Sequence, residues 1–438
     1  MGYRVRRGGL GTIDLAGHEG RKGENMNGRQ GAASGTYQVL LVTLLCLNFG
    51  ILFFDRNAMN FLMPFVQPDL GLSYTQVGML GSALSLTWAL AAIFVGWLSD
   101  KAGRRKIIIV ISTVVFSLCS VLSGLATGFL MLLGARLLMG LAEGGVMPLS
   151  HAMVAAEVAP ERRGVAMGIA QNLGSSLLGS TVAPLVLLPV AAAWGWRNGF
   201  FLAAIPGLIS ALLIALFLIE RRPAEPEPRR VAEKTPLLTL LGNRNVVTCT
   251  ILAILLVSYL VVTWAFLPLI LVQRRGYDVD TAAWLMAVLG VASAVSSFLI
   301  PWISDHVGRR PVMAGFTLLG VLLPLAALYF EGAAWMLGAM FFVGWLFNGI
   351  FPMFMATVPT ESVGPRQVAT AMGIVMGVGE IVGGVLSPSL AGWLSDIYGL
   401  TAPLWLLAAL AVLGAGTALF LRETAPRIVA RRQAWVTD

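Results

Sequence analysis

Residues 96–106 read GWLSDKAGRRK, and residues 301–311 read PWISDHVGRRP. The two segments lie 205 residues apart, and the same offset places residues 167–169 (Met-Gly-Ile) on residues 372–374 (Met-Gly-Ile). Several matches at one offset, in separate parts of a chain, are evidence for internal duplication. The sequence therefore predicts a fold built from two related halves.

Long apolar segments flank both copies. The chain has 438 residues, of which 57% are hydrophobic and 12% charged, and its mean hydropathy is +0.81, a balance that soluble globular domains do not have. A membrane-spanning helix needs roughly 20 apolar residues. Twelve segments meet this requirement, at residues 38–62, 77–99, 107–127, 129–156, 166–192, 198–219, 246–272, 281–303, 312–330, 334–357, 367–391 and 401–421. We therefore expect an all-α membrane protein of twelve transmembrane helices in two pseudo-symmetric six-helix bundles.

Polar stretches divide the chain into units. The longest polar interruption separates the two sets of six apolar segments and is predicted to be a linker. The first residues are rich in Gly, Arg and Asn, which predicts a disordered tail in which Met26 is a second candidate for the start. The predicted units are a cytoplasmic tail at 1–36, an N-terminal bundle at 37–219, a cytoplasmic linker at 220–244, a C-terminal bundle at 245–422 and a cytoplasmic tail at 423–438.

The basic residues indicate how the chain is oriented. Most of the 30 Lys and Arg residues lie in the two tails and in alternate loops between the apolar segments. Cytoplasmic loops carry an excess of such residues, so we expect both termini on the cytoplasmic side of a bacterial inner membrane. The net charge of +8 thus reports membrane topology, and we do not expect binding to nucleic acid.

The cysteines and the missing nucleotide motifs narrow the function classes. Cys46, Cys119 and Cys249 lie in apolar segments without metal-like spacing, so we expect packing roles, no disulfide framework, no metal and no cofactor. Neither a Walker motif nor a Rossmann fingerprint occurs, so the energy for any transport must come from an ion gradient. We expect a monomeric transporter in the lipid bilayer rather than an enzyme.

Two apolar segments carry charged residues. The stretch from Arg136 to Gly144 reads RLLMGLAEG and places Arg136 and Glu143 on one helical face. Adjacent Asp55 and Arg56 point roughly 100° apart on a helix, so each can address its own partner. A charge at the bilayer centre costs at least ~2.5–3.5 kcal/mol, so we expect all four side chains to face partners or water.

The duplicated loop and the stretch after Arg136 carry family signatures. The pattern G-x-x-x-D-x-x-G-R-R/K, present twice, and the RxxxGxxxG formed by Arg136, Gly140 and Gly144 resemble motifs of the major facilitator superfamily. The resemblance covers about residues 38–422 and implies two bundles that rock about a site near the membrane midplane. In the second copy Pro301 replaces the expected glycine. A gating role is implied for Gly96, Asp100, Gly103, Arg104, Arg105, Asp305, Gly308, Arg309 and Arg310; the alternative is that the basic residues only set the topology.

The four intramembrane charges resemble the anion:cation symporter branch of that superfamily, which includes galactonate-type and hexuronate-type carriers. The matching positions imply that Asp55 and Glu143 carry protons, that Arg56 binds the substrate carboxylate and that Arg136 holds the network together. Phe53 stands where that branch often has tyrosine, which removes a hydroxyl and weighs against a polyol substrate. An ion network that only locks two helices together is the alternative.

Glu380 is the one deep charge of the C-terminal half and lies among glycines. Relatives often carry an amide near this point, so an acid here suggests a substrate contact, a second proton site or a partner for Arg56, with a structural hydrogen bond as the alternative. Weaker candidates for substrate contact are Asn348, Tyr259, Trp264, Gln171 and Ser175, because polar side chains inside spans tend to face the bundle interior. For the aromatic residues, packing is the alternative.

Together these features predict a proton-coupled secondary transporter that imports a small organic anion by alternating access. The anion is expected to be an aromatic, hydroxy or sugar acid. A proton-driven exporter of amphiphilic or cationic compounds is the nearest alternative, supported by Glu380 and the apolar Phe53. A non-transporting membrane sensor is a second alternative, but the polar ends are short for a signalling domain.

Overall fold

The computed structural model describes residues 35–102, 104–159, 162–219, 240, 242–364 and 367–429. Within these ranges the side chains at 93, 96–102 and 369 are not described. The predicted gating residue Gly103, the side chain of Asp100 and the alternative start Met26 therefore lie outside the described residues, as do most of the predicted tails and linker.

The first half of the chain forms six helical spans. They are α1 (Gly35–Asp69), α2 (Tyr74–Ala102), α3 (Arg105–Gly124), α4 (Phe129–Glu143) with α5 (Val146–Glu157), α6 (Arg163–Gly168) with the π-helical η2 (Ile169–Leu173) and η3 (Ser175–Val182) and α7 (Ala183–Trp194), and α8 (Trp196–Phe217).

The second half repeats this arrangement. Its spans are α10 (Arg244–Leu269) with η4 (Ile270–Arg274), α11 (Val279–Val307), α12 (Arg309–Leu319) with α13 (Leu322–Tyr329), α14 (Ala334–Trp345) with η5 (Leu346–Ile350), η6 (Met353–Thr357) and α15 (Val358–Ser362), α16 (Val368–Val378) with η7 (Gly379–Leu386) and α17 (Ser387–Tyr398), and α18 (Ala402–Ala418).

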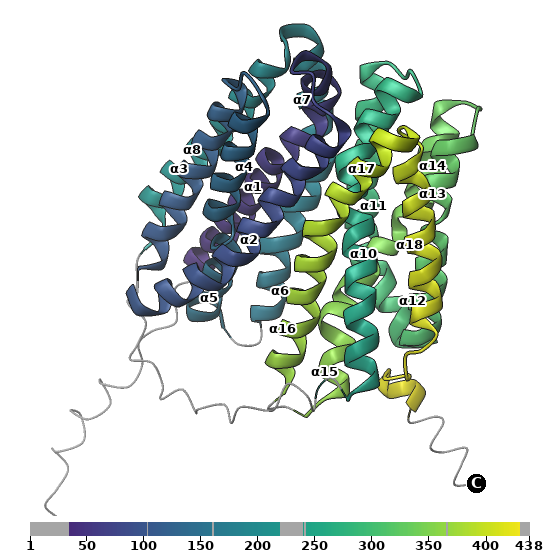
Figure 1. Cartoon of the computed structure of the whole chain (residues 1–438). Coiled ribbons are helices and arrows are strands. Elements are labelled where there is room, and N and C mark those ends of the chain that lie inside the picture. The colour runs from purple at the N-terminus through teal and green to yellow at the C-terminus, as the bar shows by residue number, and fades with distance from the viewer. Residues whose placement is uncertain are drawn as a thin grey trace, which may run out of the picture.

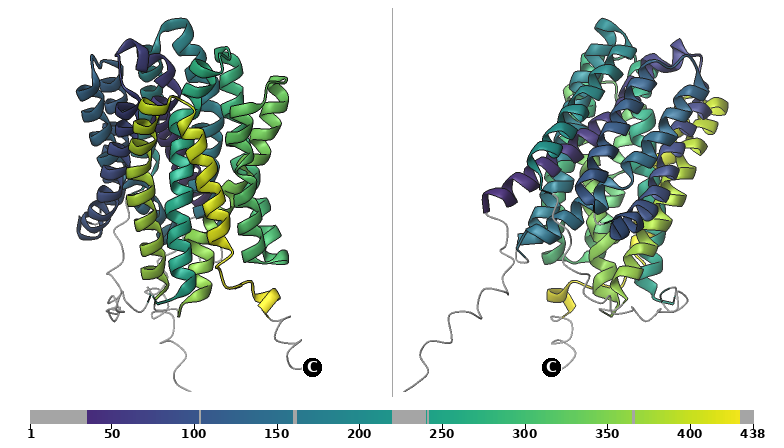
Figure 2. Two further views of the ribbon diagram at one scale, coloured as in Figure 1. Left: turned by 45° about the vertical axis from the view of Figure 1, so that its right-hand side comes forward. Right: turned by 90° about the vertical axis from the view of Figure 1, so that its left-hand side faces the viewer.

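These elements confirm the predicted all-α fold of twelve transmembrane helices. In the described part of the chain, ten helical runs are long and apolar enough to cross a membrane. The 29-residue α2 and the 17-residue α18 complete the set. In Figures 1 and 2 the helices up to α8 gather on one side of the molecule and those from α10 onward on the other.

Glycines let α4 and α2 approach closely. A Cβ at Gly144 would collide with the backbone of α2 at Trp88, and one at Gly140 would meet Thr87 and Leu84. Without the Cβ, the two backbones pack directly against each other. This contact holds α4, which carries two of the four intramembrane charges, firmly against α2.

Several spans contain π-helical or 3-10-helical turns near a proline. The π-helical turns η3 and η7 are followed by Pro184 and Pro388, and Pro352 lies between η5 and η6. Proline has no N–H to donate and clashes with the preceding turn, which disturbs the regular helix. These irregular turns include or adjoin Ser175, Asn348 and Glu380.

The basic loops lie together at one end of the molecule, which we call the basic end; it carries Arg104, Arg163, Arg244 and Arg309 at the starts of α3, α6, α10 and α12. The two halves are joined at the opposite end. There Trp264 of α10 meets Phe61 of α1 with ring centres 6.0 Å apart, and the Gln273 amide donates to the Pro64 carbonyl at 3.2 Å.

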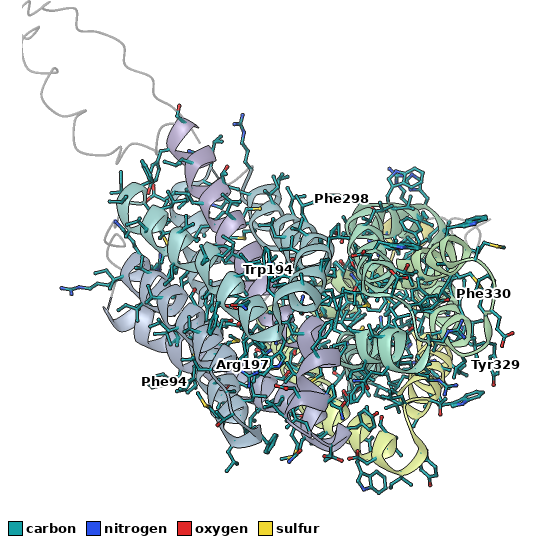
Figure 3. The ribbon with its side chains drawn as sticks, turned by 90° about the horizontal axis from the view of Figure 1, so that it is seen from above. Phe94, Trp194, Arg197, Phe298, Tyr329 and Phe330 are labelled. Atoms are coloured by element: carbon teal, nitrogen blue, oxygen red, sulfur yellow. The ribbon has the colours of Figure 1, made fainter. Side chains whose placement is uncertain are left out.

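Large apolar side chains cover the outside of the helices. Phe94 is 60% exposed and Phe298 is 77% exposed, and Figure 3 shows both on the rim of the molecule as seen along the helices. Exposure of this kind on a soluble protein would cause aggregation, whereas a bilayer covers it at no cost. The perimeter is therefore a lipid-facing surface.

Candidate functional site

The side chain of Arg56, on α1, lies between two aromatic rings. Its guanidinium carbon is 5.6 Å from the ring centre of Phe53 and 5.5 Å from that of Trp88, on α2. The side chain is 20% exposed, and its Nε lies 3.9 Å from Oε2 of Glu143, on α4. Aromatic faces attract a guanidinium without using its N–H donors, so Arg56 retains donors for an anion.

Glu143 is the acid that faces Arg56. Its side chain is fully buried, and neither carboxylate oxygen has a hydrogen-bond partner among the described residues. An ionised carboxylate in such a place is costly, and protonation removes that cost. The nearby guanidinium of Arg56 is the compensating positive charge on this side of Glu143.

Arg136, on α4, is the second guanidinium of the group. It is only 3% exposed, and its Nη1 donates to the backbone carbonyl of Arg56 at 3.2 Å. It interacts electrostatically with both Glu143 and Asp55, and its Nε has no partner in the described structure. One buried guanidinium thus serves two buried carboxylates.

Asp55 completes the group from the other face of α1. It is fully buried, its Oδ1 accepts a hydrogen bond from the Ser120 hydroxyl of α3, and its Oδ2 has no partner among the described residues. Asp55 and Arg56 therefore address different partners, as their angular separation on the helix predicts. The structure brings Asp55, Arg56, Arg136 and Glu143 into one cluster, which we call the charge cluster.

Glu380 faces the charge cluster from the other half of the molecule. It lies in η7, is half-buried, and interacts electrostatically with Arg56. A Cβ at Gly384 would come within 3.1 Å of its Oε2, with Ser85 of α2 as the next neighbour. The glycines around Glu380 thus leave its carboxylate room at the boundary between the halves.

The structure does not bring Tyr259 to this cluster. Its side chain is fully buried inside the second half, where the hydroxyl donates to the Gly320 carbonyl at 2.8 Å. Its ring packs against Trp345 and Phe347, with ring centres 6.2 and 4.6 Å away. Trp264 packs on the same aromatic group, 5.6 Å from Trp345, but also reaches the first half through Phe61.

The remaining candidates are polar side chains at the irregular turns. Ser175 donates to the Gln171 carbonyl at 2.8 Å, and the Gln171 amide contacts the Met147 sulfur at 3.3 Å. Asn348 is half-buried in η5. The side chains of all three residues are therefore partly accessible within the membrane-spanning part of the protein.

One group of residues near the charge cluster was not predicted. Asn48 of α1 accepts hydrogen bonds from Thr113 of α3 at 3.1 Å and from Ser210 of α8 at 2.9 Å, and Ser120 holds Asp55. The available signal was a run of hydroxyl residues on one face of the segment 107–127, which hydropathy alone does not reveal.

The two copies of the duplicated loop are described to different extents. In the second copy Arg309 is buried and pairs with Asp305 at 2.6 Å and Glu361 at 3.0 Å, while Gly308 turns the chain with φ +117°. In the first copy Arg105 donates to the Ala152 carbonyl at 3.2 Å. Arg104 and Arg310 are exposed at the same end.

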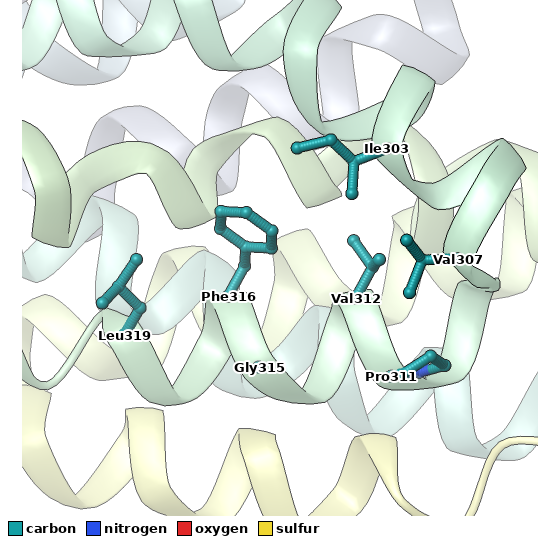
Figure 4. A pocket seen from close by; sticks show the side chains of 7 residues that line it. All are labelled: Ile303, Val307, Pro311, Val312, Gly315, Phe316 and Leu319. Carbon is teal, nitrogen blue, oxygen red and sulfur yellow. The ribbon is translucent and has the colours of Figure 1, made fainter.

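An apolar groove also opens between α11 and α12, away from the charge cluster (Figure 4). It is lined by Ile303, Val307, Pro311, Val312, Gly315, Phe316 and Leu319. These side chains offer neither charge nor hydrogen bonds, so the groove cannot select an anion.

Comparison with known proteins identifies the family to which this sequence is similar. The sequence model of the Major Facilitator Superfamily matches residues 45–378 and 260–436 of this chain. Together these two matches cover nearly all of the described structure, including the charge cluster and both copies of the duplicated loop.

Three curated relatives are named for different transport functions. A probable sulfoacetate transporter, SauU, from Cupriavidus necator is 28% identical over 411 residues, which cover 87% of this chain and 93% of that protein. A hexuronate transporter from Bacillus subtilis is 31% identical, covering 63% of this chain and 66% of that protein. The multidrug resistance protein MdtL of Salmonella paratyphi A is 26% identical, covering 78% and 84%.

A solved structure shows the same fold. A bacterial homologue of the human lysosomal transporter Spinster, in an inward-facing and unoccupied conformation, superimposes with a TM-score of 0.70 at 21% identity. The match covers 89% of this chain and 95% of that chain. At this level of identity the likeness concerns the fold alone.

Proposed function

This chain belongs to the Major Facilitator Superfamily and is a secondary transporter rather than an enzyme, and we propose that it carries a small organic anion together with protons. The observation that carries this proposal is the partly exposed Arg56, which faces a buried Glu143 whose carboxylate accepts no hydrogen bond from the described residues. A guanidinium in this position has two possible partners, the protein's own carboxylate and an anion from solution.

The coupling follows from competition for Arg56. When an anion binds Arg56, the attraction that keeps Glu143 ionised weakens, and Glu143 takes up a proton. When the proton leaves, Glu143 competes again for Arg56 and favours release of the anion. Arg136 links this step to Asp55, because one buried guanidinium compensates both carboxylates.

The substrate class is suggested by the surroundings of Arg56. A carboxylate or sulfonate satisfies a guanidinium, and the rings of Phe53 and Trp88 beside it favour a flat or apolar body behind the acidic group. Two of the relatives are named for sulfoacetate and hexuronate, which are both organic anions. Asn348, Gln171 and Ser175 are the proposed contacts for additional polar groups.

The direction of transport and the orientation belong to the same proposal. We place the basic end in the cytoplasm of a bacterial cell, with both tails on that side, because cytoplasmic loops collect Lys and Arg. The units at 37–219 and 245–422 then rock as a monomer about the charge cluster, joined by the linker at 220–244 and flanked by tails at 1–36 and 423–438. Because the anion moves together with protons, an inward proton gradient would drive its import.

An exporter of amphiphilic or cationic compounds is the second candidate. Glu380 faces the cluster from the second half, and a half-buried acid there can bind a cation. The similarity to MdtL favours the same alternative. This candidate makes Glu380, rather than Arg56, the residue on which ligand binding depends.

A ligand screen by thermal shift separates the two candidates. Purified protein is heated with glucuronate, sulfoacetate, aromatic acids and cationic drugs in turn, because a ligand that binds the folded state raises its melting temperature. Arg56→Ala is compared with Arg197→Ala, a matched arginine that pairs with Asp69 at 3.0 Å and lies over the Trp196 ring.

We expect an anion to stabilise the wild type and Arg197→Ala, but not Arg56→Ala. Stabilisation of Arg56→Ala by the same anion to the same extent defeats the proposal. Stabilisation by cations alone, lost in Glu380→Gln, replaces it with the exporter.

A further inference from the structure

One face of α3 carries buried hydroxyl groups, and two of them donate hydrogen bonds to side chains of α1. Thr113 meets Asn48 at 3.1 Å, and seven residues further along both helices Ser120 meets Asp55. The two helices therefore stay in register over two turns. Ser117 lies between these levels, fully buried, and donates to the Thr113 carbonyl at 2.8 Å.

Asp55 is held asymmetrically by this face. Its Oδ1 accepts the Ser120 hydroxyl, whereas its fully buried Oδ2 has no partner among the described residues. The other titratable or charged groups that act on Asp55 are Glu143 and Arg136 of α4 and the thiol of Cys119. The structure records a hydrogen bond to the Asp55 carboxylate from Ser120, and it records none from these three groups.

We propose that Ser120 is a positioning residue for the proton of Asp55. It orients the carboxyl and satisfies Oδ1, so that Oδ2 is the oxygen that gains and loses the proton. A hydroxyl that donates to a carboxylate stabilises the ionised form. Ser120 thus contributes, beside Glu143 and Arg136, to the pH at which Asp55 changes its charge; this inference rests on the proposed proton coupling.

Infrared spectroscopy tests this proposal without a ligand. The carbonyl stretch of a protonated carboxyl is followed as the pH is raised, and the band that disappears in Asp55→Asn is assigned to Asp55. In Ser120→Ala we expect this band to persist to a pH higher by roughly one unit, the effect of losing one hydrogen bond to a charged group.

Ser123→Ala is the matched control, because Ser123 is also buried on α3 but donates only to the Cys119 carbonyl, at 2.8 Å. In Ser123→Ala we expect the Asp55 band to disappear at the same pH as in the wild type. In Ser120→Cys, which restores a weak donor, we expect it to disappear at a pH between those of the wild type and Ser120→Ala. An Asp55 band that Ser120→Ala does not move overturns this inference alone. If no titrating band is lost in Asp55→Asn, the proposed proton coupling at Asp55 is overturned as well.

A second observation concerns the end of the molecule opposite the basic loops. Asp396, near the end of α17, accepts the backbone N–H groups of Tyr74 and Thr75 at 2.8 Å each and the Thr75 hydroxyl at 2.6 Å. Tyr74 and Thr75 are the first residues of α2, whose N–H groups have no partner within the helix. A carboxylate of one half therefore caps a helix of the other half.

Neighbouring contacts make this junction tight. Ser82 and Ser389 share a hydrogen bond of 2.7 Å, and a Cβ at Gly392 would collide with the Tyr74 backbone. Rocking of the halves that opens this end must break the cap. We infer that Asp396 is a latch that stabilises the state in which this end is closed.

Asp278 provides a matched control for the latch. It caps α11 by accepting the Thr281 N–H at 2.9 Å, but both residues belong to the same half. Loss of either cap frays the helix that it caps, whereas only loss of Asp396 removes a bond between the halves.

Hydrogen–deuterium exchange of the full chain in lipid nanodiscs distinguishes these effects. In Asp396→Ala we expect roughly 5–30-fold faster exchange at the start of α2 and also at the distant junction where Gly290 of α11 meets Ser180 and Thr181. In Asp278→Ala we expect faster exchange only at the start of α11. If the change in Asp396→Ala stays within the first turn of α2, Asp396 is a helix cap and not a latch.

Discussion

In the proposed mechanism, Glu143 is the residue that couples the proton to the anion. Replacing it with glutamine keeps the shape and removes the charge, so Arg56 loses its competitor. We expect Glu143→Gln to bind and exchange anions across the membrane but to lose accumulation driven by a proton gradient. Uptake into proteoliposomes, with and without an imposed gradient, measures this.

The control for that measurement is Glu331→Gln, an exposed acid in a loop of the second half. It is expected to accumulate the anion as the wild type does. Gradient-driven accumulation that survives in Glu143→Gln assigns the coupling proton to another group.

We expect replacement of Arg136 to lower the stability of the folded protein. Arg136→Ala leaves Asp55 and Glu143 buried without their shared guanidinium, which costs about 3–5 kcal/mol of unfolding free energy. Adding Glu143→Gln removes one of the uncompensated charges, so the double variant is expected to lose less than the sum of the single losses. Denaturation in detergent micelles measures each variant, and simple additivity would mean that the residues do not interact.

At the scale of helices, the contact between α4 and α2 depends on two missing side chains. Gly144→Val places a branched side chain against the α2 backbone at Trp88, so we expect a loss of about 1–3 kcal/mol or more. Gly134→Ala is the matched control on α4, because a Cβ there meets nothing within 4 Å. It is expected to be neutral or to stabilise the helix by up to ~1 kcal/mol. Thermal unfolding in detergent compares the two variants, and equal losses would remove the close approach as the cause.

The helices and the charge cluster could be predicted from sequence because both are conspicuous against an apolar background. Asp55 and Glu143 stand out inside spans where a charge is costly. Ser120 does not, because most serines in such helices bond their own backbone, as Ser117 does. Tyr259 was a weaker candidate for substrate contact, with packing as the alternative, and the sequence does not show that its hydroxyl donates to the Gly320 carbonyl.

The irregular turns could be predicted only in part. Proline marks where a helix is disturbed, and Pro184, Pro352 and Pro388 do lie beside π-helical turns. Pro64, by contrast, lies inside a continuous α1. Whether a span bends at a proline depends on which neighbouring groups satisfy the freed carbonyl, and the sequence does not contain that information.

At the scale of the whole molecule, orientation is open to a direct test. If the basic end faces the cytoplasm, a cysteine at Glu331 lies outside the cell and one at Arg310 lies inside. We expect a membrane-impermeant thiol reagent to label Glu331→Cys in intact cells and Arg310→Cys only after permeabilisation. Unchanged protein is the control, since Cys119 and Cys249 are buried and Cys46 is partly so. The reverse pattern would invert the orientation.

The unequal distribution of charge between the duplicated halves has an evolutionary consequence. Asp55, Arg56, Arg136 and Glu143 all belong to the first copy, and among the described residues Glu380 is the acid that faces them from the second copy. If the proposed proton coupling holds, the first copy carries the groups for the driving ion, and the second copy can vary without removing them. Exchanging the second half with that of a relative should leave the ion requirement and the need for an acidic group unchanged, and should alter only the selectivity for the part of the substrate that Asn348 and Glu380 face.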